Sequence, residues 1–343
     1  MNEFSKTLVA KSLACAFAVA AMSGLGQQAA AQATGTNNPF AGAKSWAYQL
    51  KNLGPEQRQA IAVSSYDLMV VDYARSLDSD TGAEVPLTRE QVAAMQKKPD
   101  GSRRIVIAYL SIGESENYRY YWKPEWNKKR PAWMGAESKE WPGNYLVQYW
   151  NKDWQHIIFG NPDSFVDRIL AAGFDGFYVD RSDAYYRFGD TQQARDRMVD
   201  FVINLSKYIH SKKTDAAIMI QNAEELLDRP NFVAAIDAIA KEDLVFGITH
   251  REERNKPDDI EWSDKLLRQA QDKGKRIFVV EYLTKPGYID AAKKFMQSHD
   301  YVLYYGPRGL FELNPAANAE KATPAGAPDA GDKPAKSKAK AEQ

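Results

Sequence analysis

Residues 174–180 read Phe-Asp-Gly-Phe-Tyr-Val-Asp, a short apolar run that ends on an acidic residue. Seven further apolar runs follow one another along the chain, and amphipathic stretches separate most of them. We expect all eight runs to be strands: Trp46–Leu50, Leu68–Tyr73, Ile105–Ser111, Phe174–Asp180, Ala216–Gln221, Ile236–Ala240, Ile277–Leu283 and Tyr301–Tyr305. Such alternation of strand and helix patterns is typical of a parallel α/β fold.

Residue types at the ends of the amphipathic stretches predict where the helices begin. Pro55 should open the first helix, and Thr88 with Gln91 has the pattern of a capping box for the second. The dipeptide Asn161-Pro162 predicts the start of a third. Further helices are expected over residues 191–212, 258–273 and 286–298, with only a short turn at 224–228 between the fifth and sixth strands.

Eight strand–helix units within residues 34–313 match the size of a (β/α)8 TIM barrel. A doubly wound open sheet is the alternative, and it would need a glycine-rich phosphate turn after the first strand. That position holds Gln49-Leu50-Lys51-Asn52, which contains no glycine. The sequence therefore favours the barrel.

The first 33 residues have the pattern of a secretory signal peptide. Lys6 and Lys11 supply the basic region, Leu13 to Met22 the apolar region, and Ala31-Gln32-Ala33 a cleavage site. The apolar run is too short to span a bilayer, so we expect no membrane span. A buried N-terminal helix is the alternative. We expect a secreted or periplasmic protein that is cleaved after Ala33.

Composition excludes several classes of protein. The formal net charge is +0, which gives no reason to expect a nucleic-acid partner. Cys15 is the one cysteine and would leave with the signal peptide, so disulfides, cysteine-bound zinc and iron–sulfur clusters are excluded. The four histidines form no HxH or HExxH pair, and we expect neither a metal nor another cofactor.

Residues 314–343 contain ten alanines, four prolines and no aromatic residue. Such a segment cannot bury enough apolar surface to offset the entropy of ordering, so we expect a disordered tail. Nothing in the chain indicates oligomerisation, and we expect a monomer.

The longest departure from even strand spacing is an aromatic-rich insertion at residues 112–161, after the third strand. It holds Trp122, Trp126, Trp133, Trp141, Trp150 and Trp154, six of the eight tryptophans in the chain. A loop in this place overlies the usual active-site face of a barrel. We expect the insertion to lack strands of its own and to form one wall of an extended cleft, with Trp122 and Trp126 stacking on sugar rings. A satellite core beneath a long loop is the alternative.

The ends of the predicted strands carry many acidic residues. The candidates at or just after strand ends are Asp72, Glu114, Asp180, Asp183, Gln221, Asn222, Glu224, Glu242, Glu281, Tyr305 and Arg308. Helix capping alone does not explain so many acids, because close carboxylates repel each other and raise each other's pKa. Three chemistries fit: glycoside hydrolysis by two carboxylates, a hard divalent cation, or a Schiff base on Lys241.

Several runs resemble glycoside hydrolase family 114, the endo-α-1,4-polygalactosaminidases. They are Trp46–Leu50 (WAYQL), Ile105–Glu114 (IVIAYLSIGE), Gly173–Tyr185 (GFDGFYVDRSDAY), Ile220–Leu227 (IQNAEELL), Ile239–Leu244 (IAKEDL) and Val279–Leu283 (VVEYL). The resemblance implies a bacterial (β/α)8 hydrolase of α-1,4-linked galactosamine polymers. It places the nucleophile on Asp180 and the acid/base on Glu242. The insertion and the cysteine-free core depart from the family's fungal members.

Around this pair we expect a retaining two-carboxylate mechanism and a set of substrate-binding residues: Tyr48, Asp72, Glu114, Trp122, Trp126, Asp183, Asn222, Glu224, Glu281 and Tyr305. The surplus carboxylates would suit the ammonium group of a free amino sugar. A sugar-binding barrel without turnover is the main alternative. A lyase that depends on Lys241 or on a metal is the other.

The first testable prediction concerns the N-terminus. Protein recovered outside the cytoplasm should begin at Thr34, because small residues occupy the positions three and one before the cleavage point. Intact-mass measurement of that protein checks this, and retention of residues 1–33 would contradict it.

Overall fold

The computed structural model describes residues 38–77, 79–80 and 82–314. The signal peptide expected at residues 1–33 and nearly all of the expected tail lie outside the described residues. Within the described part, no helix is long and apolar enough to cross a membrane.

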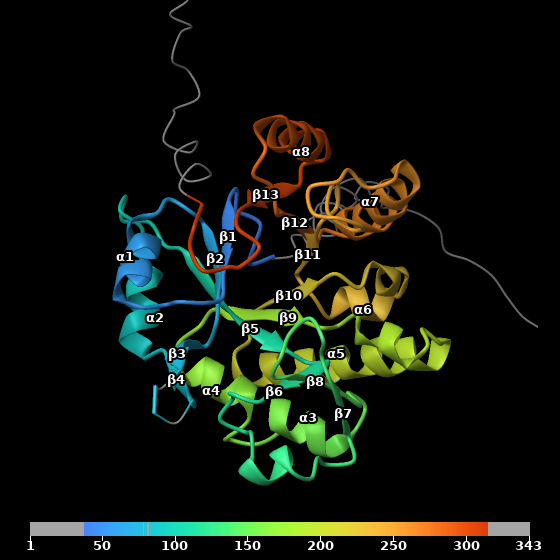
Figure 1. The fold of residues 1–343 in the computed structure, drawn as a ribbon. Coiled ribbons are helices and arrows are strands. Elements are labelled where there is room, and N and C mark those ends of the chain that lie inside the picture. Colours follow the sequence, from blue (N-terminus) through green and yellow to red (C-terminus); the bar gives the residue numbers. More distant parts are fainter. Residues whose placement is uncertain (1–37, 78, 81, 315–343) are drawn as a thin grey trace, which may run out of the picture. The chain divides into compact units, whose positions relative to one another are not determined.

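Eight parallel strands form one sheet, in the order in which they occur along the chain (Figure 1). They are β1 (Trp46–Gln49), β2 (Leu68–Val71), β5 (Ile105–Ser111), β9 (Gly176–Asp180), β10 (Ala217–Gln221), β11 (Ala238–Glu242), β12 (Arg276–Glu281) and β13 (Val302–Tyr305). All eight predicted strands are confirmed. The register sets their carboxyl ends level, for example Ser111 beside Asp180 and Glu281 beside Tyr305.

The first and last strands come together and nearly close the sheet into a barrel. The indole N–H of Trp46 on β1 donates to the carbonyl oxygen of Val302 on β13 over 2.9 Å. No backbone ladder joins these two strands within the described residues. The same indole packs edge-on against Phe278 and Tyr304 inside the barrel. The barrel prediction is therefore confirmed over the open sheet.

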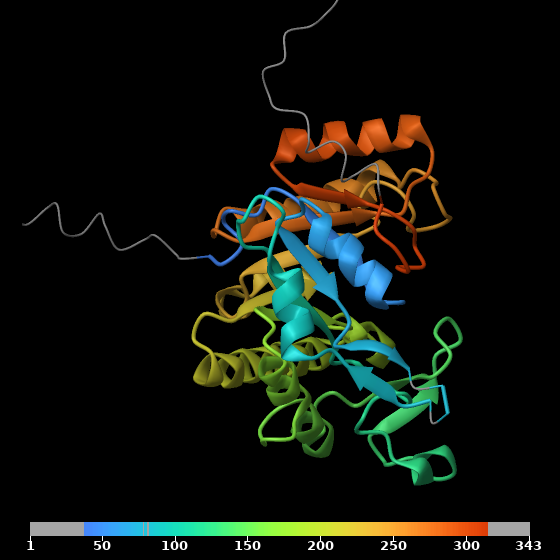
Figure 2. The same ribbon diagram turned by 90° about the vertical axis from the view of Figure 1, so that its left-hand side faces the viewer.

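The helices lie outside the strands (Figures 1 and 2). Those of the described residues are α1 (Pro55–Val63), α2 (Arg89–Met95), α3 (Lys152–Ile158), α4 (Phe165–Ala171), α5 (Gln192–Lys212), α6 (Pro230–Ala234), α7 (Pro257–Gln271) and α8 (Pro286–His299). The capping box of Thr88 and Gln91 is present.

Two helix predictions were wrong in detail. The helix expected at Asn161-Pro162 begins at Phe165, because the Ser164 hydroxyl caps it and the Asn161 side chain forms a turn with the Asp163 N–H instead. The region between the fifth and sixth strands holds the five-residue α6 as well as the expected turn η3 (Glu224–Asp228). A helix this short has too few residues to show a periodic pattern.

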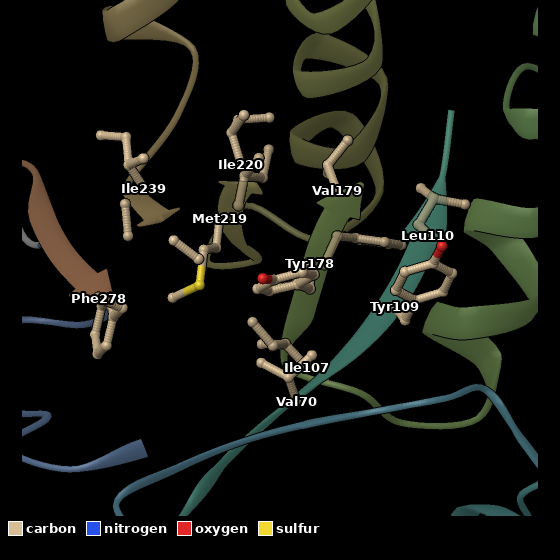
Figure 3. Close-up of a cluster of buried hydrophobic side chains, with 14 of the residues drawn as sticks. Val70, Ile107, Tyr109, Leu110, Tyr178, Val179, Met219, Ile220, Ile239 and Phe278 are labelled. Carbon is tan, nitrogen blue, oxygen red and sulfur yellow. The ribbon is translucent and has the colours of Figure 1, made fainter. Parts of the chain in front are cut away.

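Apolar and aromatic side chains fill the barrel interior (Figure 3). The ring of Tyr178 on β9 lies 4.9 Å from that of Tyr48 on β1, measured between centroids. Gly176 begins β9 where the next strand comes closest, since an added Cβ would lie 2.0 Å from the Ala217 carbonyl oxygen. This packed interior is a rigid support for residues at the upper ends of the strands.

Two small antiparallel sheets are added at the carboxyl end of the barrel. One is the hairpin of β3 (Ala74–Leu77) and β4 (Glu84–Pro86) after β2. The other belongs to the aromatic-rich insertion and has the order β6 (Glu114–Glu116), β8 (Asn144–Val147), β7 (Met134–Glu137). The expectation that the insertion lacks strands was wrong. These strands have only three or four residues and show no apolar alternation in the sequence.

Replacing Trp46 by Phe tests the closure of the barrel. The variant keeps an aromatic ring in the interior, although a smaller one, and leaves the buried Val302 carbonyl oxygen without its donor, which should lower the free energy of unfolding by about 1–3 kcal/mol. Denaturant unfolding measures this. The matched control is Trp262→Phe on α7, whose side chain is exposed, and an equal effect of both changes would contradict the prediction.

Candidate active site

A cavity of about 660 Å³ opens at the carboxyl ends of the strands. The sequence-predicted residues among its lining are Tyr48, Asp72, Glu114, Asp180, Asp183, Gln221, Asn222, Glu242 and Arg308. The structure therefore brings both predicted catalytic carboxylates into one space, together with five of the expected substrate-binding residues. The remaining expected residues, Trp122, Trp126, Glu224, Glu281 and Tyr305, are not among the described residues that line it.

Asp180 is the last residue of β9, and two donors fix its half-buried carboxylate. The Tyr109 hydroxyl donates to Oδ2 over 2.7 Å, and the Arg181 backbone N–H donates to Oδ1 over 2.7 Å. Burial raises the pKa of Asp180 to about 7, although Arg181 and the Tyr109 hydrogen bond oppose the rise. Repulsion from Glu242 adds to it. Asp180 is thus poised to change protonation near neutral pH.

Glu242 ends β11, two strands further round the sheet. The Tyr282 hydroxyl donates to its Oε1, and its own backbone N–H donates to Asn222 Oδ1 over 3.1 Å. Burial raises the pKa of Glu242, opposed by the Tyr282 hydrogen bond and supported by repulsion from Asp243. A carboxyl group in such a place keeps its proton at a higher pH than usual, as a general acid requires.

The backbone turns sharply just beyond three neighbouring strands. Arg181 after β9, Asn222 after β10 and Asp243 after β11 all have positive φ values, of 59°, 54° and 54°. Non-glycine residues in this region cost of order 1 kcal/mol each and persist where the surrounding structure enforces them. Their concentration beside Asp180 and Glu242 is typical of a functional site.

Glu114 begins β6 and forms an ion pair within the cavity lining. Its Oε1 accepts from Arg181 Nη2 over 2.6 Å, and its Oε2 accepts from Asn144 Nδ2 over 3.1 Å. Both oxygens therefore have protein donors. Glu114 orients Arg181, which in turn lies beside Asp180.

The carboxylate of Asp72 is also occupied by a protein donor. Arg119, which is buried in the insertion, donates to both of its oxygens over 2.8 Å. The same guanidinium donates to Glu84 over 3.1 Å and to Glu116 over 2.7 Å. Sequence reasoning missed Arg119, Glu84 and Glu116, because none of them follows a barrel strand.

Lys241 and Glu224 form a buried ion pair beside the cavity. Their Nζ and Oε1 atoms lie 2.9 Å apart, and the Ser263 hydroxyl donates to the same carboxylate oxygen over 2.7 Å. Burial lowers the pKa of Lys241, but the Glu224 charge outweighs it and leaves the pKa raised. Formation of a Schiff base needs an unprotonated amine. The raised pKa of Lys241 keeps its amine protonated and so disfavours Schiff-base chemistry.

Glu281 is fully buried, and its carboxylate accepts hydrogen bonds from backbone N–H groups instead of lining the cavity. It accepts from the N–H groups of Val245 and Phe246 over 2.7 and 3.2 Å, and burial raises its pKa to about 8. It thus anchors the loop that follows Glu242. Tyr305 ends the neighbouring strand β13 and is buried as well.

Trp122 and Trp126 pack within the insertion. Their ring centroids lie 5.5 Å apart, the Trp122 ring lies tilted at 5.0 Å from that of Tyr145, and the Trp126 ring lies 5.4 Å from that of Trp133. They are not among the described residues that line the cavity, and ring contacts within the insertion bury Trp126 and half-bury Trp122. Trp141 lines the cavity instead, and its side chain is 45% exposed.

Two tyrosines that the sequence reasoning did not single out complete the site. Tyr109 contacts Asp180 and Tyr282 contacts Glu242. Tyr109 could have been found from the two-residue period of its strand, because it shares a face with Ser111, which lies beside Asp180.

Among the described residues, no group of three or more His, Cys, Asp or Glu side chains is arranged to hold a metal ion. What the arrangement can do chemically is acid–base and nucleophilic catalysis by two carboxylates. A (β/α)8 barrel with such a pair at its carboxyl end has the architecture of a glycoside hydrolase.

The comparisons with known proteins agree with this class. Residues 26–305 match glycoside-hydrolase family GH114, and the chain belongs to that family. An uncharacterized protein of Deinococcus radiodurans is 34% identical over 269 residues, which are 78% of this chain and 82% of that protein. An uncharacterized protein of Thermotoga maritima is 32% identical over 247 residues, or 70% and 71% of the two chains.

Solved structures share the fold at low sequence identity. The glycoside hydrolase domain of PelA from Pseudomonas aeruginosa has a TM-score of 0.59 at 17% identity, covering 79% of this chain and 98% of that one. Ega3 of Aspergillus fumigatus, solved with galactosamine, has a TM-score of 0.54 at 18% identity, covering 79% and 94%. At these identities the similarity shows the barrel fold alone.

The raised pKa of Asp180 predicts how stability depends on pH. The unfolded chain ionises this group near pH 4, whereas the folded protein keeps its proton up to about pH 7, so its contribution to stability falls as pH rises through this window. Asp180→Asn cannot ionise. Relative to wild type, the variant should therefore be more stable at pH 8 than at pH 4. The change in relative free energy of unfolding should be at most about 4 kcal/mol, and it should appear as a higher relative melting temperature at pH 8.

Calorimetry at the two pH values measures this difference. The matched control is Asp163→Asn, because the Asp163 side chain is 90% exposed. An offset between Asp180→Asn and wild type that does not change with pH would contradict the prediction.

Proposed function

We propose that the protein is a retaining glycoside hydrolase that cleaves α-1,4-linked galactosamine polymers within the chain. The observation that carries this proposal is the pair of half-buried carboxylates in one cavity, Asp180 and Glu242. Each has a raised pKa, and each accepts a hydrogen bond from a tyrosine hydroxyl.

The hydrogen-bond partners favour Asp180 as nucleophile and Glu242 as acid/base. Asp180 accepts from two donors and lies beside the Arg181 cation, and all three favour its ionised form. Glu242 ends its strand among other acids and is repelled by Asp243. Because the two carboxylates repel each other, ionisation of one holds the proton on the other.

In the proposed first step, Glu242 protonates the glycosidic oxygen while an Asp180 oxygen attacks the anomeric carbon. The bond to the leaving sugar breaks and a glycosyl–Asp180 ester forms. Glu242, now ionised, removes a proton from a water molecule that attacks the same carbon and releases Asp180. Arg181, held by Glu114, stabilises the negative charge of Asp180 before attack and after release.

The substrate class rests on the family and on the charges of the cavity. Family GH114 is the basis for a glycosidase, and Ega3, which shares the fold, was solved with galactosamine. Asp183 lines the cavity and lies near the Asp180 carboxylate. An ammonium group bound there would form charge-assisted hydrogen bonds.

We further propose that the protein acts as a monomer outside the cytoplasm, on the strength of the signal-peptide pattern at residues 1–33. A binding protein without turnover is less well supported, because such a protein would not need two carboxylates with raised pKa values. The ion pair of Lys241 with Glu224 likewise disfavours the lyase alternative.

The decisive experiment measures new reducing ends released from a panel of amino-sugar polymers. Asp180→Asn and Glu242→Gln should each lower turnover by about three orders of magnitude or more, because each removes a group that acts in the transition state. Asp163→Asn, remote from the cavity, should retain wild-type turnover. Azide should partly restore Glu242→Ala by attacking the glycosyl–Asp180 ester.

NMR of the first product then tests the stereochemistry. A retained anomer is expected from double displacement. An inverted anomer would overturn the nucleophile role of Asp180, and full activity of either carboxylate variant would overturn the catalytic pair.

A further inference from the structure

Two cationic side chains in the cavity lining have no carboxylate partner within the described part of the chain. Lys51, just after β1, places its Nζ 5.5 Å from the ring centroid of Trp141 and 5.2 Å from that of Phe311. Arg75, on β3, has a buried Nε that makes no hydrogen bond. The positive charge of Arg75 acts on Arg58: burial lowers the pKa of Arg58, and repulsion from Arg75 lowers it further.

The other cations of the lining are neutralised. Arg181 pairs with Glu114 over 2.6 Å, and Arg308 pairs with Asp243 over 2.8 Å. Lys51 and Arg75 differ from these two cations, since no carboxylate within the described residues neutralises their charges.

Two exposed apolar side chains line the same cavity. Leu77 follows Arg75 on β3 and is 53% exposed, and Trp141 lies in the turn between β7 and β8 and is 45% exposed. Exposed apolar groups beside unpaired donors are typical of a ligand site, where a few polar groups fix the orientation of a ligand that packs on apolar surface. An aromatic face such as that of Trp141 suits the apolar face of a sugar ring.

We propose that Lys51, Arg75, Leu77 and Trp141 form a subsite for a sugar unit whose 2-amino group is acetylated. Two uncompensated cations repel the ammonium group of a free amino sugar. The carbonyl oxygen of an acetamido group accepts hydrogen bonds from such donors, and its methyl group packs on Leu77 or Trp141. This inference rests on the proposed function and specifies its substrate.

The rest of the lining has the opposite preference. Asp180 and Asp183 lie near the end of β9, and their ionised carboxylates attract an ammonium group. One cavity thus offers an acidic part for a deacetylated unit and a cationic, apolar part for an acetylated one. The substrate that satisfies both parts is a partially acetylated chain.

The test compares polymers of α-1,4-linked galactosamine that are fully deacetylated, about half acetylated and fully acetylated. The wild type should cleave the half-acetylated polymer with the highest kcat/KM, by about tenfold over either extreme, which corresponds to one charge-assisted hydrogen bond. Mass spectrometry of the products should find an acetylated unit at a fixed distance from the cleaved bond. Acetyl groups placed at random around that bond would overturn the subsite.

Charge reversal tests the residues themselves. Lys51→Glu and Arg75→Glu should each abolish the preference for the half-acetylated polymer over the deacetylated one, while Lys273→Glu, an exposed change at the end of α7, should preserve it. Trp141→Ala should raise KM for the half-acetylated polymer, and Trp262→Ala, equally exposed but on α7, should not. An unchanged preference in both charge-reversal variants would overturn the proposal.

Binding to Asp180→Asn separates this proposal from the proposed function. Calorimetry with N-acetylgalactosamine oligomers should show affinity that falls about tenfold on adding Lys51→Glu or Arg75→Glu. If no polymer is cleaved but this dependence is seen, the hydrolase fails and the subsite stands. If oligogalacturonate binds more tightly and with the same dependence, the site takes an anionic sugar and the proposal fails.

Discussion

The guanidinium of Arg119 is the interaction on which the upper part of the molecule depends. It is buried and donates to carboxylates from three separate segments: Asp72 after β2, Glu84 on β4 and Glu116 on β6. Removing one partner of a buried ionic cluster leaves uncompensated charge, so the three segments hold their positions together or not at all. The hairpin and the insertion are thereby fixed to the barrel, and with them the cavity wall that carries Arg75 and Trp141.

Below that wall, burial that stabilises the barrel works against the ionised state of the two carboxylates proposed to be catalytic. Asp180 and Glu242 end strands whose other residues, apart from Lys241, are buried core, and this desolvation raises the pKa of both. The hydroxyls of Tyr109 and Tyr282 donate hydrogen bonds to these carboxylates and are therefore not used elsewhere in the fold. Together with the positive φ values beyond the strands, this marks a region whose backbone and side chains are held in place at a cost in stability.

The sequence was sufficient to predict the barrel, because each strand is an apolar run long enough to be recognised. Once the strands were located, the acidic residues at their carboxyl ends could be placed on one face of the barrel. The prediction that Asp180 and Glu242 form the catalytic pair rests on the resemblance to a family, and the structure places both side chains in one cavity. The sequence could not predict the partners of Arg119, which come from distant segments with no shared pattern. Nor could it separate Trp141 from Trp122 and Trp126, because only packing decides which of several tryptophans remains exposed.

Residue type alone also misjudges what a charged side chain in the cavity can do. Asp72 and Glu114 were expected to bind substrate, yet protein donors occupy both oxygens of each. A carboxylate satisfied in this way gains little from a ligand's ammonium group, since the bond it would form replaces one it already has. The charges that remain for a ligand are those that the protein's own groups leave uncompensated within the described residues. A net charge of +0 therefore says nothing about the cavity, where the ion pairs that the fold completes decide which charges can act on a ligand.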